Sequence, residues 1–175
     1  MSESFKRMNP NILITGTPGT GKSTLSELVL ESTGLNYINV NEIVKEKGLH
    51  EGFDQEFQSY ILDDDKVVDE LEDIVSKGGN IVDYHSCDLF PERWFDLVLV
   101  LRTDITILYD RLEKRFKITE NIDCEIFQVI LEEAKESYAN EIVIELQSNT
   151  IQDMESNASR IEQWVYNFKT QKNKH

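Results

Sequence analysis

The chain has 175 residues, of which 33 are acidic and 18 are basic, so its formal net charge is −15. This length suits one domain with a sizeable hydrophobic core. A field of this sign repels nucleic acid, so strong direct binding of DNA or RNA is not expected. The chain contains no apolar run of about 18 residues, so we expect no membrane-spanning helix.

The first predicted elements enclose a glycine-rich loop. The apolar run over 11–15 is typical of a buried strand, and apolar spacing predicts a helix over 22–33 that Gly34 ends. Between them lies the stretch Gly16-Thr-Pro-Gly-Thr-Gly-Lys-Ser23, which matches the phosphate-binding pattern G-x-x-x-x-G-K-[ST]. A plain glycine turn before a helix is the alternative interpretation, but strand, loop and helix together favour a nucleotide site.

The residue types of this loop suit a triphosphate. Glycines let backbone N–H groups curl around an anion, and the helix start adds its dipole. Lys22 would reach the β- and γ-phosphates, and the Ser23 hydroxyl would ligate Mg²⁺. The predicted ATP contacts in the loop are Gly19, Thr20, Gly21, Lys22, Ser23 and Thr24.

The next segments alternate in character. A short strand over 37–40 precedes a short helix over 41–47, and the stretch 49–62 is polar, aromatic and without periodicity, which favours a mobile flap. The acids at 63–65 open a strong helix that ends before the two glycines at 78–79. Its expected buried face comprises Val67, Val68, Leu71, Ile74 and Val75.

The second half continues the alternation with strands over 80–84, 97–101 and 141–146. Asp104 can cap a helix whose expected inward residues are Ile105, Leu108, Tyr109 and Leu112. A helix over 122–138 is expected to bury Ile126, Val129, Ile130 and Ala134. The last helix, 151–168, has the apolar stripe Met154, Ala158, Ile161, Val165 and Phe168, and the basic tail after it is expected to fray.

This order of elements predicts a three-layer α/β fold, a five-stranded parallel sheet with helices on both faces. Ligands of such sheets bind at the carboxyl ends of the strands. The glycine loop, the loop after Asp83 and the end of the strand at Arg102 all emerge there.

Asp83 and His85 follow a buried strand at this edge. The Asp83 carboxylate suits Mg²⁺, held directly or through water, although capping of a turn is the alternative. His85 can orient an attacking water or a phosphate, or position Asp83, and an ordinary surface histidine fits the spacing equally well. The acids at 63–65 are better explained as a helix start than as a metal cluster.

Four arginines are cationic candidates for the transferred phosphoryl group: Arg93, Arg102, Arg111 and Arg115. Arg111 and Arg115 lie four residues apart, so one helix face can present both. Surface ion pairing, for example with Glu113, is the alternative, and it is favoured for Arg111. Cys87 and Cys124 are expected to be reduced thiols with structural roles, because two cysteines are too few for a disulfide framework.

Several blocks resemble the adenylate kinase isoenzyme 6 family. They are the glycine loop, Asn36-Tyr-Ile-Asn-Val40, Ile61-Leu-Asp-Asp-Asp65 with Val67-Val-Asp-Glu-Leu71, Ile81-Val-Asp-Tyr-His85, Phe90-Pro-Glu-Arg-Trp94, Val100-Leu-Arg-Thr103 and Cys124-Glu-Ile-Phe-Gln128. The resemblance runs from Asn11 to Trp164. It implies a P-loop fold of the nucleoside monophosphate kinase type, with one domain over 1–175, an acceptor-binding flap at 39–62 and a short lid at about 114–120.

The resemblance also implies a function: transfer of a phosphoryl group from ATP to AMP, with some tolerance for other nucleoside monophosphates, and slow ATP hydrolysis. It implies Lys22, Asp83, His85 and Arg115 as catalytic residues, with Arg115 also contacting ATP from the lid. Magnesium would be held by Ser23 and Asp83. The acceptor site would include Asn39, Lys45 and Arg93.

Further implications concern the cell. The resemblance implies a role in maturation of the small ribosomal subunit and its 18S RNA, through a basic ribosomal protein of that subunit. It also implies nuclear and cytoplasmic locations. The polar residues 1–7 lack the apolar core of a signal peptide, which favours an intracellular protein, and we expect a monomer.

Two departures from the family pattern bear on activity. The segment after Arg115 is shorter than is usual for the family, which predicts less efficient closure and transfer. Lys45 stands where an arginine is common, and lysine loses the bidentate fork. An alternative is therefore an ATPase assembly factor with weak kinase activity that binds a basic ribosomal protein. A kinase for another small acceptor is a third hypothesis.

Overall fold

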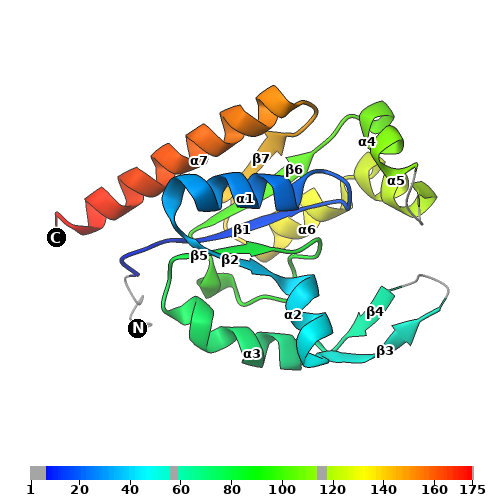
Figure 1. Ribbon diagram of the computed structural model, residues 1–175, viewed down its shortest axis with the longest axis horizontal. Helices are drawn as coiled ribbons and strands as arrows, with labels where there is room; N and C mark the ends of the chain where they lie inside the picture. Colours follow the sequence, from blue (N-terminus) through cyan, green and yellow to red (C-terminus); the bar gives the residue numbers. More distant parts are fainter. Residues whose placement is uncertain (1–6, 56–58, 114–117, 175) are drawn as a thin grey trace.

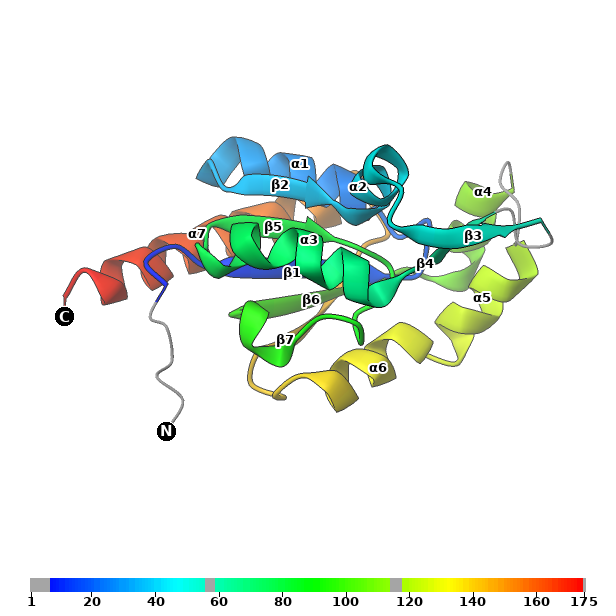
Figure 2. The same cartoon turned by 90° about the horizontal axis from the view of Figure 1, so that it is seen from below.

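The computed structural model describes residues 7–55, 59–113 and 118–174. Among these residues, a five-stranded parallel sheet runs through the molecule between two layers of helices (Figures 1 and 2). Its strands are β1 (Asn11–Gly16), β2 (Asn36–Asn39), β5 (Asn80–Asp83), β6 (Leu97–Arg102) and β7 (Val143–Gln147). Their order across the sheet is β2-β5-β1-β6-β7, so the strand that leads into the glycine loop lies in the middle. The predicted fold class is confirmed.

Alternation along the strands divides the core between the two faces. Ile12 and Ile14 of β1 lie in a buried cluster with α1 (Lys22–Thr33) and α7 (Ile151–Lys172). Leu13, which points to the opposite face, lies in a second cluster. A strand buried on both faces favours apolar residues on both of them, and this is why Ile12, Leu13 and Ile14 form a continuous apolar run in the centre of β1.

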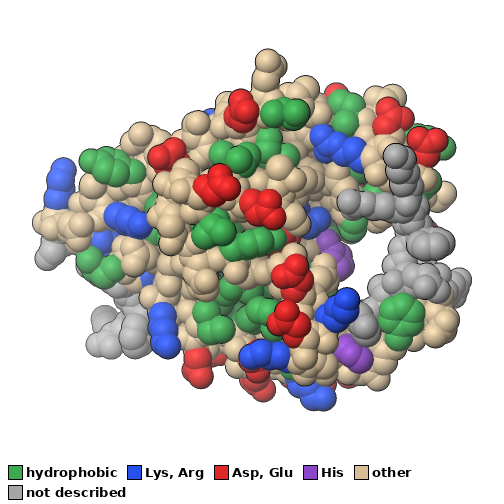
Figure 3. All heavy atoms as spheres, viewed as in Figure 1, with side chains coloured by type: hydrophobic (Ala, Val, Ile, Leu, Met, Phe, Trp, Pro, Cys, Tyr) green, Lys and Arg blue, Asp and Glu red, His purple; other side chains and the backbone are tan. Residues whose placement is uncertain are grey.

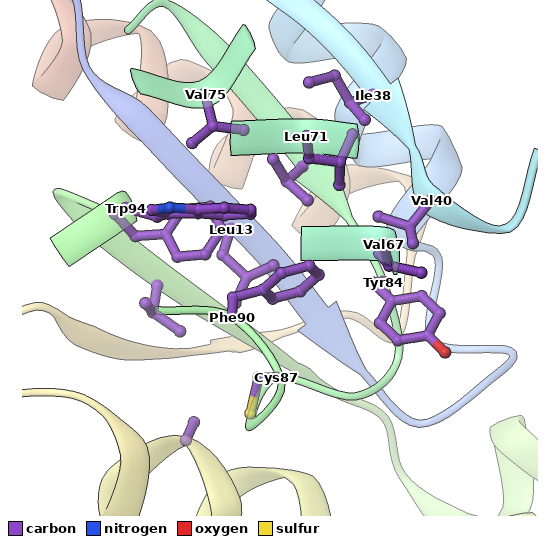
Figure 4. Close-up of a cluster of buried hydrophobic side chains, with 14 of the residues drawn as sticks. Leu13, Ile38, Val40, Val67, Leu71, Val75, Tyr84, Cys87, Phe90 and Trp94 are labelled. Carbon is purple, nitrogen blue, oxygen red and sulfur yellow. The ribbon is translucent and has the colours of Figure 1, made fainter. Parts of the chain in front are cut away.

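The second cluster fills the face covered by α3 (Asp64–Ser76) and α6 (Val129–Ser137). Figure 4 shows Trp94 and Phe90 packed beside Leu13 of β1, with Val67, Leu71 and Val75 of α3 on the other side. Aromatic rings therefore occupy much of the space between this face of the sheet and α3.

The remaining elements are α2 (Val40–Lys47), β3 (His50–Asp54), β4 (Ser59–Leu62), the 3-10 helix η1 (Glu92–Trp94), α4 (Ile105–Leu112) and α5 (Ile118–Ile126). None of the helices in the described ranges is both long and apolar enough to cross a membrane. Cys87 is buried and Cys124 is half-buried, and both are free thiols.

The stretch 49–62 differs from its prediction. It contains an antiparallel hairpin, β3–β4, in which Phe53 lies opposite Tyr60 and Asp54 lies opposite Ser59. The hairpin projects from the body beside α2 (Figure 1). A register shift between His50 and Gly52 makes the pairing irregular, and the described residues of β3 alternate only between half-buried and exposed, so the sequence has no strong apolar period there.

The predicted single helix over 122–138 is two helices. Gln128, between α5 and α6, has a left-handed backbone with φ of 55°. Both expected core residues beside this break, Ile126 and Val129, are exposed, as are Ile74, Ile105 and Tyr109 on other helices. The last helix also continues to Lys172 instead of fraying from Lys169.

Candidate nucleotide site

The glycine loop connects β1 to α1. Gly21 occupies the N-cap of α1 with a left-handed φ of 97°, and among the described residues no side chain caps this helix start. The first N–H groups of a helix have no partner within the helix. The start of α1 therefore presents backbone donors and the positive end of the helix dipole to a ligand such as phosphate.

Packing on the inner side fixes the shape of the loop. The Thr20 hydroxyl is buried and donates to the Thr17 carbonyl at 2.7 Å, while the Thr20 carbonyl accepts from the Ser148 hydroxyl at 2.6 Å. The Thr20 side chain therefore points into the protein, its N–H also donates to the Thr17 carbonyl at 3.2 Å, and Thr20 is not among the described residues that line the cavity. Lys22 crosses the loop, where its Nζ donates to the carbonyls of Gly16 at 3.1 Å and Thr17 at 3.4 Å.

Asp83 ends β5 beside the loop and is 5% exposed. Its Oδ2 accepts hydrogen bonds from the Ser23 hydroxyl at 3.3 Å and from the Tyr37 hydroxyl at 2.7 Å. Burial, followed by the hydrogen bond and charge of Asp83, raises the pKa of Tyr37 to about 12. Tyr37 is therefore a hydrogen-bond donor at neutral pH.

These groups surround a cavity of about 830 Å³. Its lining comprises Pro18, Gly19, Gly21, Lys22, Ser23, Thr24, Leu28, Asn39, Asn41, Asp83, His85, Arg111, Thr150, Ile151, Met154 and Glu155. Figure 3 shows the molecule hollowed at the end where the strands of the sheet terminate. The cavity therefore lies at the carboxyl edge of the sheet, as the topology predicts.

The loop that carries His85 is anchored from α6. Glu133 Oε1 accepts from the Ser86 hydroxyl at 3.0 Å and from the backbone N–H groups of Cys87 at 3.2 Å and Asp88 at 3.3 Å. Burial and the nearby Asp88 raise the pKa of Glu133. The ring of His85 lies 4.4 Å from the ring of Tyr84, centroid to centroid.

Arg111 is a site residue that the sequence interpretation placed in a surface ion pair. Its guanidinium donates to the carbonyls of Gly19 at 3.2 Å, Ser148 at 3.0 Å and Asn149 at 3.0 Å, and to the Thr103 hydroxyl at 3.3 Å. Burial lowers its pKa. The arginine therefore connects the glycine loop to the loop after β7. In the sequence, only its spacing of four residues from Arg115 indicated a place in the site.

Other predicted residues lie elsewhere. Arg93 pairs with Glu72 of α3 at 2.6 Å, and its carbonyl accepts from Arg7, so it sits at the amino-terminal edge of the sheet, opposite the cavity. The expectation that Arg93 joins the acceptor site is not met. Lys45 is exposed on α2 and is not among the described residues of the lining. Arg115 lies outside the described residues, as does most of the predicted lid.

Arg102, another predicted phosphate-binding residue, binds α5 and is not among the described residues of the cavity lining. Its guanidinium forms an ion pair with the buried Glu125 of α5 and donates to the Glu125 carbonyl at 3.0 Å. Asp63 caps α3 by accepting from the Lys66 N–H, which agrees with a helix start. Within the described ranges, no group of three or more His, Cys, Asp and Glu side chains is arranged to hold a metal ion.

Comparison with known structures agrees with this architecture. Residues 12–128 match the family model of an AAA domain. A shikimate kinase from Acinetobacter baumannii, solved in complex with shikimate, superposes with a TM-score of 0.61 over 91% of this chain and 94% of its own, at 16% identity. A gluconokinase from Sinorhizobium meliloti superposes with a TM-score of 0.54 over 91% and 97%, at 16% identity. These likenesses show a P-loop kinase fold.

Curated relatives are far more similar in sequence. The adenylate kinase isoenzyme 6 homolog of Dictyostelium discoideum is 60% identical over 94% of this chain and 97% of its own length. Proteins of the same name from Caenorhabditis elegans and Drosophila melanogaster are 51% and 45% identical, and each comparison covers at least 97% of both chains. The chain belongs to the adenylate kinase isoenzyme 6 family.

Proposed function

We propose that this protein transfers the γ-phosphoryl group of ATP to AMP, so that one ATP and one AMP give two ADP. The observation that carries the proposal is the meeting of Lys22, Ser23 and Asp83 in one cavity, next to a helix start that is open to an anion. The name of the relatives supports the choice of AMP. Other nucleoside monophosphates are secondary acceptors in this proposal.

The triphosphate of ATP would lie on the glycine loop, with the base further along the cavity. That part of the lining is formed by Arg111, Ile151 and Met154. A planar guanidinium and apolar side chains suit a purine ring. Lys22 would leave the carbonyls of Gly16 and Thr17 for phosphate oxygens, which are stronger acceptors because they are charged.

Ser23 and Asp83 fit a magnesium ion. Magnesium prefers oxygen ligands and keeps several waters, so it needs few protein side chains, in agreement with one hydroxyl and one carboxylate. When bound, the ion would neutralise charge that develops on the β- and γ-phosphate oxygens. The two side chains already lie 3.3 Å apart, measured from Ser23 Oγ to Asp83 Oδ2.

The acceptor would enter on the side of α2. Asn39 and Asn41, at the start of α2, line this part of the cavity, and the β3–β4 hairpin projects from the body beside α2 (Figure 1). The proposed acceptor flap at 39–62 therefore comprises α2 and the hairpin. Transfer of a phosphoryl group depends on positioning and charge neutralisation, so Lys22 and His85 would act on phosphate or water that these walls hold in place.

A coupled assay of ADP formation from ATP, AMP and magnesium tests this proposal. Lys22→Met is expected to lower turnover by about 100-fold, because it removes a cation from the migrating charge. Lys135→Met, on the exposed side of α6, is the matched control and should retain activity. Absence of AMP-dependent ADP from folded wild-type protein would reject the proposal, and a screen of small alcohols would then test another acceptor.

A second candidate function is an ATPase cycle that gates binding to a basic protein of the small ribosomal subunit. The net charge of −15 favours a basic partner, and His85 lines the cavity beside Asp83. In this proposal His85→Gly impairs ATP hydrolysis or partner release more than ATP binding. A variant equal to wild type in both would remove the gating role of His85. Nuclear and cytoplasmic locations belong to the same proposal.

A further inference from the structure

Tyr37 contacts Asp83, a proposed magnesium ligand, but does not itself appear in the described lining of the cavity. Its hydroxyl donates to Asp83 Oδ2 at 2.7 Å. Tyr37 is half-buried against the cluster of α1 and α7 and is not among the described residues that line the cavity. It therefore acts on the proposed nucleotide through residues of the lining, and its shortest hydrogen bond is to Asp83.

The sheet register explains this placement. Strands β2 and β5 are parallel neighbours, with Tyr37 opposite Ile81 and Asn39 opposite Asp83. Residues two apart on a strand point to the same face, so Tyr37, Asn39 and Asp83 share one face. The Asn39 amide also donates to the Tyr37 hydroxyl, at 3.5 Å. Two rigid strands thus hold the tyrosine hydroxyl against the carboxylate.

We propose that Tyr37 is a positioning residue that holds the Asp83 carboxylate in the orientation needed for a magnesium nucleotide. The terminal torsion of an aspartate has a broad, two-fold profile, and a fixed hydrogen-bond donor narrows it. Ser23 also donates to Asp83, but it is itself a proposed magnesium ligand. Partners of metal ligands commonly contribute to metal affinity in this way. The inference rests on the proposed magnesium site and on ATP as its ligand.

The test measures binding of a fluorescent ATP analogue with excess magnesium and with excess EDTA. Tyr37→Phe removes only the hydroxyl. We expect the affinity of this variant for the ATP analogue in EDTA to match that of wild type. The factor by which magnesium increases that affinity should fall by about ten-fold. Tyr166→Phe, which alters an exposed tyrosine of α7, is the matched control and should keep the full enhancement. An unchanged enhancement in Tyr37→Phe would overturn the proposal.

A double-mutant cycle separates positioning from a general structural role. If Tyr37 acts through Asp83, adding Tyr37→Phe to Asp83→Asn should cause no further loss of magnesium enhancement. Additive losses would overturn the proposal, as would a wild-type protein whose nucleotide affinity ignores magnesium. Wild-type protein that binds the magnesium nucleotide but forms no AMP-dependent ADP would overturn only the proposed transfer.

Discussion

Gly19 is subject to two separate constraints within the glycine loop. Its φ of 96° is left-handed, and an added Cβ would lie 2.9 Å from Cδ2 of the buried Leu112 and 3.1 Å from Cδ1 of the buried Leu108. Gly34, after α1, has a similar φ of 71° but open space around it. Comparing the two positions separates backbone strain from packing.

Gly19→Ala should therefore destabilise the protein more than Gly34→Ala. The backbone term costs about 1 kcal/mol at either position, and the collision with the two leucines adds about 1–3 kcal/mol at Gly19. Urea unfolding of both variants measures the difference. Equal losses would show that the leucines of α4 yield without cost.

Glu133 gives the protein a pH-dependent contribution to stability. Its folded-state pKa is raised above 4.5, chiefly by burial, so folding favours the protonated form. The associated stability is present below pH 4.5 and is lost as the pH rises through the folded-state pKa. Glu133→Gln mimics the protonated form and still offers an oxygen to the loop over residues 86–88.

The unfolding free energy of Glu133→Gln, minus that of wild type, should accordingly rise as the pH increases from about 4 to 7. Unfolding by urea across this range measures the slope. Glu132→Gln, at an exposed neighbouring position, should give a nearly flat difference. A falling difference for Glu133→Gln would contradict the direction of the pKa shift.

At the scale of elements, α5 is attached to the sheet by polar contacts. Glu125 is 2% exposed and forms an ion pair with Arg102 at the end of β6. Next to it, the Thr17 hydroxyl in the glycine loop donates to Cys124 Sγ at 3.6 Å. One turn of α5 thus contacts both β6 and the loop.

Glu125→Ala should cost about 3 kcal/mol of stability, because removing one partner leaves a partly buried charge without its closest counterion. Glu132→Ala breaks an exposed pair with Lys135 at 3.9 Å and should cost less than about 1 kcal/mol. Thermal or chemical unfolding of both variants provides the comparison. Similar small losses would indicate that Glu145, 3.5 Å from Arg102, replaces the missing carboxylate.

Elements with strong local signals were predictable, and those set by tertiary contacts were not. Apolar runs and glycines marked β1, α1 and β5 nearly to the residue. No glycine or proline marks the break at Gln128. The two helices separate there because Glu125 of α5 binds Arg102, while α6 packs Ile130 and Ala134 into the core.

The site residues were likewise predictable where a local sequence pattern marked them, and not where distant contacts place them. The loop residues and Asp83 were found because their pattern is local. Arg111 was missed because its partners, Gly19, Ser148 and Asn149, come from distant parts of the chain. Arg93 was misplaced because sequence does not reveal which end of the sheet the loop before β6 occupies. Tyr37 lies in a block that resembles the family, but the block assigns it no role, since its contact with Asp83 follows from the pairing of β2 with β5.

At the scale of the whole molecule, the net charge of −15 opposes compaction through self-repulsion. Salt shortens the range of this repulsion, from about 30 Å at 0.01 M to about 8 Å at 0.15 M. The thermal midpoint should therefore rise by roughly 2–5 °C between these sodium chloride concentrations. Repeating the experiment with potassium chloride excludes a specific sodium effect, and a falling midpoint would mean that attractive pairs dominate the electrostatics.

The strand order β2-β5-β1-β6-β7 has an evolutionary consequence. One wall of the cavity contains Asn39, which ends the strand at one margin of the sheet, and Asn41. The other wall contains Thr150, Ile151, Met154 and Glu155, which follow the strand at the opposite margin. Each margin can diverge while the central strand and its loop are inherited intact. A substitution in one wall can therefore change the shape of the cavity while the central strand and the glycine loop keep their places.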